Sequence, residues 1–74
     1  MQIDDKNSSD PLDHTRPIAQ ALQELSDHLR QDIEKVDEPR AQALFETAAE
    51  VLLGVRTAFV HYGEGKEKAW SSNT

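Results

Sequence analysis

Residues 38–62, EPRAQALFETAAEVLLGVRTAFVHY, carry the strongest structural signal in this chain of 74 residues. Apolar residues recur there every three or four positions, which is typical of an amphipathic α-helix. The main apolar seam has an unbroken heptad-type spacing and consists of Ala41, Phe45, Ala48, Leu52, Val55, Phe59 and Tyr62. Further apolar residues flank the seam, so that the apolar arc spans roughly 220° of a helical wheel. These are Leu44, Val51 and Ala58 on one side and Ala49, Leu53 and Val60 on the other.

A second amphipathic helix is predicted over residues 17–36. Pro17 suits the first position of a helix, where its missing N–H would have no partner. The apolar residues fall within an arc of roughly 80° and are Ile18, Leu22, Leu25, Leu29, Ile33 and Val36. Pro39 restricts the residue before it, so the first helix should end near Val36. Gly63 is a natural end for the second helix.

A linker of about two residues makes the helices antiparallel neighbours. With the turn at residues 37–38, two residues that face each other have numbers that add up to about 75. Leu52 should then be the most buried side chain and contact Leu22 and Leu25. One neighbouring helix covers only part of the wide apolar arc. The predicted fold class is therefore all-α, an antiparallel hairpin of residues 17–36 and 38–62 that dimerises into a four-helix bundle.

A need for a partner also follows from size and composition. A chain of 74 residues buries a small core, and without cysteine it has no disulfides to stabilise it. The predicted interface residues are Leu44, Val51, Leu53, Arg56, Val60 and Trp70. Arg56 lies within the apolar arc, where it either extends its charge to solvent or pairs with a partner's carboxylate. Trp70 either anchors a partner or folds back near Phe59 and Tyr62.

Three segments are expected along the chain: a flexible acidic leader of residues 1–14, a helical hairpin of residues 15–63, and a flexible charged tail of residues 64–74. The net charge is −6. The leader holds half of this excess, with four aspartates against Lys6. Such a charge disfavours nucleic acid and anionic membranes as partners. No signal peptide or membrane-spanning stretch is recognisable, and the lack of cysteine fits a cytoplasmic protein.

The sequence favours no catalytic, cofactor or metal site. There is no Glu-x-x-His pair of the kind that di-iron bundles use, and no glycine-rich phosphate loop. The leading hypothesis is a non-enzymatic protein-interaction module of the adaptor, co-chaperone or regulator type, which forms a homodimer and acts by binding another protein. The two alternatives are a regulator associated with RNA or DNA, which would need a basic stripe, and a metal-carrying bundle, which would need inward carboxylates and histidines.

Overall fold

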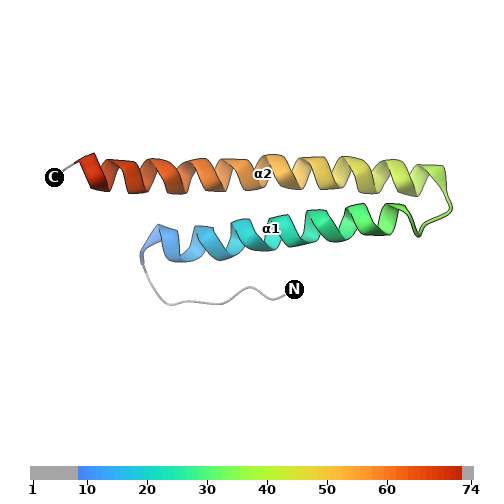
Figure 1. Cartoon of the computed structure of the whole chain (residues 1–74), viewed down its shortest axis with the longest axis horizontal. Helices are drawn as coiled ribbons and strands as arrows, with labels where there is room; N and C mark the ends of the chain where they lie inside the picture. The colour runs from blue at the N-terminus through green and yellow to red at the C-terminus, as the bar shows by residue number, and fades with distance from the viewer. Residues whose placement is uncertain (1–8, 73–74) are drawn as a thin grey trace.

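The chain forms an antiparallel helical hairpin, as the sequence predicts (Figure 1). The structure is a computed structural model that describes residues 9–72, with side chains described for residues 9–66. Within that part of the chain there are two helices and no strand: α1 spans Pro11–Ile33 and α2 spans Pro39–Ser72. The core lies between the two helices, which run side by side along the length of α1 (Figure 1).

Helix α1 begins six residues before the predicted start at Pro17, because a better capping pair lies upstream. Pro11 occupies the start of the helix, and the side chain of Asp10 accepts a hydrogen bond of 3.0 Å from the backbone N–H of Leu12. Pro17 therefore lies inside the helix, where it removes one backbone hydrogen bond. The earlier start adds Leu12 and Thr15 to the contact with α2. Leu12 Cδ2 lies 3.6 Å from the point that a Cβ on Gly63 would occupy.

Helix α2 does not end at Gly63, so that prediction is wrong. Neither Gly63 nor Gly65 adopts a positive φ, and the helix continues to Ser72. A helical glycine costs about 1 kcal/mol relative to alanine, which does not stop a helix when good helix formers follow. Here the following residues are mostly glutamate, lysine and alanine. As a result α2 projects beyond the start of α1 (Figure 1).

The connection between the helices is longer than the predicted two residues, since α1 ends at Ile33 and α2 begins at Pro39. The backbone N–H groups of Lys35 and Val36 both donate to the carbonyl oxygen of Asp32, at 2.9 and 3.1 Å. The side chain of Gln42 donates to the carbonyl oxygen of Val36 at 2.9 Å. The Asp32 carbonyl oxygen at the end of α1 is satisfied by the connection, and the Val36 carbonyl oxygen of the connection is satisfied by α2.

The register of the hairpin agrees with the sequence prediction, but the rotation of the helices about their axes does not. Ser26 lies opposite Ala49, and its hydroxyl donates to the carbonyl oxygen of Ala49 at 3.1 Å. Both residues have no exposed surface, whereas Leu52 is only half-buried. The prediction that Leu52 is the most buried residue is therefore wrong. Small side chains occupy the closest contact because they let the two backbones approach, while larger residues pack around them.

The α1-facing side of α2 is thus rotated relative to the predicted seam, toward the flank that contains Ala49 and Leu53. Its half-buried or buried residues are Ala41, Gln42, Phe45, Ala48, Ala49, Leu52, Leu53, Arg56, Phe59, Val60 and Gly63. Val55, which the hairpin predicted from the sequence pairs with Leu22 and Ile18 of the first helix, is exposed, and Tyr62 is exposed as well.

Ala49→Leu should lower the free energy of unfolding by about 1–3 kcal/mol, because three added carbon atoms would force α1 and α2 apart. Urea denaturation at fixed protein concentration measures this loss. Ala43→Leu is the matched control, since Ala43 lies on the same helix and is exposed. Equal effects of the two substitutions would show that the helices do not meet at Ala49.

Candidate functional site

The most unusual surface feature of the hairpin is a row of exposed large apolar side chains along α2. The exposed fractions are 63% for Leu44, 58% for Val51, 41% for Val55 and 47% for Tyr62. These residues follow one another at intervals of seven, four and seven positions, so they share one face of the helix. Contiguous exposed apolar residues on a small protein usually mark an interaction site.

Ala48 and Ala58 fill the gaps in this row. Together the six residues form a heptad-type seam with spacings of four, three, four, three and four, which we call the lateral seam: Leu44, Ala48, Val51, Val55, Ala58 and Tyr62. It covers roughly 80° of the helix, and its centre lies roughly 125° from the side that faces α1. The lateral seam contains no charged residue.

Helix α1 borders the lateral seam at its Tyr62 end. An open groove of about 450 Å³ there is lined by Pro11, His14, Thr15, Ala58, Phe59 and Tyr62. His14 of α1 therefore lies on the same side of the hairpin as the seam. Ile18 and Leu25 follow His14 by four and eleven residues, which places them on that same face of α1. Both are half-buried. The apolar face of the hairpin thus includes part of both helices.

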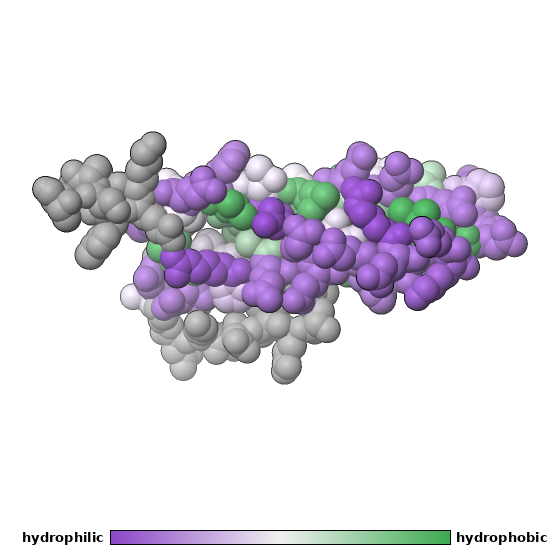
Figure 2. All heavy atoms as spheres, in the orientation of Figure 1, coloured by the Kyte–Doolittle hydropathy of each residue, from purple (hydrophilic) through white to green (hydrophobic). Residues whose placement is uncertain are grey.

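The face of the hairpin shown in Figure 2 is mainly hydrophilic, with small hydrophobic patches on and between the helices. Polar side chains of α1 pair along the helix in regular steps. The amide of Gln20 donates to Glu24 at 3.3 Å, and the amide of Gln23 donates to Asp27 at 2.9 Å. These residue pairs are four positions apart, as is usual for side chains that meet on a solvated helix face.

The six predicted interface residues do not all lie together. Leu44 and Val51 belong to the lateral seam and are exposed. Leu53, Arg56 and Val60 are half-buried on the α1-facing side of α2. Trp70 lies in α2, but its side chain is outside the described residues. The sequence interpretation placed Val55 and Tyr62 in the main seam and not among the predicted interface residues. Their spacing relative to Leu44 and Val51 was visible in the sequence, but the rotation of α2 was not.

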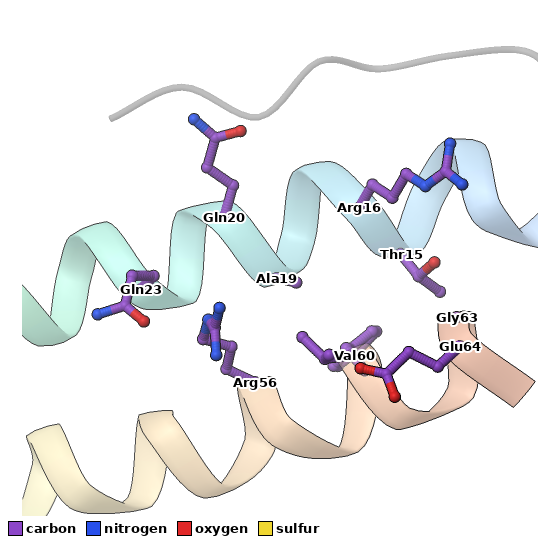
Figure 3. A pocket seen from close by; sticks show the side chains of 10 residues that line it. Thr15, Arg16, Ala19, Gln20, Gln23, Arg56, Val60, Gly63 and Glu64 are labelled. Atoms are coloured by element: carbon purple, nitrogen blue, oxygen red, sulfur yellow. The ribbon is translucent and has the colours of Figure 1, made fainter.

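Arg56 lines a second groove between the helices, of about 390 Å³ (Figure 3). Its side chain reaches from α2 toward Gln23 of α1 (Figure 3). Ala19, Val60 and Thr15 also line this groove, and Thr15 Oγ1 is buried with no hydrogen-bond partner among the described residues. Within the described part of the chain Arg56 forms no ion pair. Its side chain is half-buried between the two helices.

The described residues contain no group of three or more potential ligands that could hold a metal ion. His28 instead lies 3.2 Å from Asp32, four residues further along α1. Neither α1 nor α2, over the part that is described, has an apolar stretch long enough to cross a membrane. Comparison with protein-family models, with curated proteins and with solved structures found no match.

Arg56→Met should leave the free energy of unfolding within about 0.5 kcal/mol of that of the parent, because methionine keeps a long unbranched side chain between the helices. Arg56→Ala removes that packing and should cost about 1 kcal/mol. Thermal and urea denaturation of both variants measure the difference. If Arg56→Met were as costly as Arg56→Ala, the charge rather than the stem would be what stabilises the protein.

Proposed function

We propose that this protein is a non-enzymatic interaction module that works as a homodimer, in which two hairpins pack through their lateral seams into a four-helix bundle. The observation that carries the proposal is the exposure of Leu44, Val51, Val55 and Tyr62 along one face of α2. Moving a leucine or valine side chain from full exposure to full burial contributes about 1.5–3 kcal/mol, and a partner would add part of that amount at each residue, because 41–63% of it is still exposed. A partner that covers this face therefore gains substantial hydrophobic stabilisation.

The small size of the hairpin core supports the same proposal. The buried apolar residues among the described side chains are Ala21 and Ala49, which are both small. Chains of this size commonly reach adequate stability by association when they have no disulfides or metal. The chain contains no cysteine. Formation of a dimer would add the larger side chains of α2 to the core.

The chemistry of the seam favours a second copy over a charged partner. The lateral seam carries no side chain that is charged at neutral pH, so a second copy covers it without burying a charge. The net charge of −6 opposes close approach of nucleic acid and anionic membranes. A two-fold dimer is also the commonest assembly of soluble proteins. In this bundle the exposed polar faces of the four helices would be the surfaces that meet other proteins.

Glutamate at two positions of the lateral seam should abolish the dimer. In the double variant Val51→Glu/Val55→Glu, association would bury four unpaired carboxylates at the centre of the interface, which costs several kcal/mol. Sedimentation equilibrium at micromolar concentration should give twice the chain mass for the parent and a single-chain mass for the variant. The stability of the variant should no longer depend on protein concentration.

The matched control is Ala43→Glu/Thr57→Glu, which adds the same charge at two exposed positions outside the seam on the same helix. This variant should dimerise nearly as well as the parent. If the parent sediments as a monomer, the proposal is wrong. If the seam variant and the control associate equally well, another surface forms the dimer.

A further inference from the structure

The lateral seam has nearly the same pattern of side-chain size in both directions along α2. Its midpoint is position 53. Leu44 and Tyr62, the two largest residues, each lie nine positions from it, Ala48 and Ala58 lie five positions away, and Val51 and Val55 lie two positions away. The spacings of any six-residue heptad-type seam read the same in both directions. The match in side-chain size between the two halves of this seam does not follow from the spacing and is a property of this sequence.

Helix α1 has its own apolar residues centred at the same level. The contact between Ser26 and Ala49 places residue 22 of α1 level with position 53 of α2. On the face of α1 that borders the lateral seam, the midpoint between Ile18 and Leu25 lies within one residue of that level. The apolar residues of both helices are therefore centred on one line across the hairpin.

We infer that the second copy packs with its α2 antiparallel to the first, around a two-fold axis that crosses the helices at position 53. This inference rests on the proposed homodimer and specifies its geometry. The axis exchanges the two ends of each helix, so Leu44 meets the partner's Tyr62, Ala48 meets the partner's Ala58, and Val51 meets the partner's Val55. The alanine pairs let the two backbones approach, and the valine pair fills the centre.

The same axis places α1 over its own counterpart, with Ile18 opposite the partner's Leu25. A single interface then covers the apolar residues of both α1 and α2. In a parallel dimer every residue lies level with the same residue of the partner. The match in side-chain size on either side of position 53 would then have no effect on the packing. In addition, a parallel axis along the α2 seam leaves α1 without a counterpart. The antiparallel arrangement is therefore the one that uses both symmetric patterns.

Distances between spin labels test the geometry in the full-length chain. The protein has no cysteine, so single substitutions Ala43→Cys and Glu50→Cys give one label per chain at exposed positions outside the lateral seam. In the antiparallel dimer the two labels at position 43 are about 30 Å apart along the helix, and those at position 50 about 9 Å apart, at a rise of 1.5 Å per residue. A parallel dimer gives equally short distances at both positions.

Sedimentation of the labelled chains shows whether a dimer forms, and the distances show how its two copies are oriented. A dimer in which the distance at position 43 exceeds that at position 50 by about 15–20 Å supports the antiparallel geometry. A dimer with equal distances overturns that geometry but leaves the homodimer in place. A monomer overturns both. Dilution with excess unlabelled chain is the control, because it should remove every distance that arises between two copies.

Discussion

Ser26 of α1 and Ala49 of α2 are both fully buried where the two helices meet, and the Ser26 hydroxyl donates to the Ala49 carbonyl oxygen at 3.1 Å. This contact fixes two properties of the hairpin at once. It sets the level of one helix against the other, and it sets which side of α2 faces α1. Larger side chains at these two positions would hold the backbones apart, so the small residues determine how closely the helices pack.

The rotation of α2 decides which part of its wide apolar arc is left exposed. Ala49, Leu53 and Val60 turn toward α1, so the opposite flank with Leu44 and Val51 lies at the surface together with Val55 and Tyr62. If α2 were turned by about 100°, the angle of one residue, so that Leu44 and Val51 faced α1, then Leu53 and Val60 would be exposed instead. The composition and symmetry of the lateral seam are therefore consequences of a contact between two small residues on another side of the helix.

The ends of the helices show a different balance of forces. Asp10 and Pro11 supply a side-chain cap and a suitable first residue, and the earlier start places Leu12 and Thr15 against α2. Capping and added contact with α2 together outweigh the hydrogen bond lost at Pro17. At the other end, the glycine at position 63 has a small cost in a helix and no turn demands a positive φ from it. Local signals at Pro17 and Gly63 predicted boundaries that these wider interactions override.

The sequence by itself determined that the chain is helical, that a break near Pro39 makes a hairpin, which residues lie level with one another, and that α2 has more apolar surface than one neighbour covers. These properties follow from the period of the apolar residues and from the position of the proline, which are local. The tertiary structure alone decided the rotation of the helices. Ranking residues by hydrophobicity placed Leu52 at the centre and overlooked Ser26, because close packing favours small side chains at the nearest approach and hydrophobicity does not measure that. The identity of the exposed residues depends on this rotation, so Val55 could be assigned to the surface only once the packing of α1 against α2 was known.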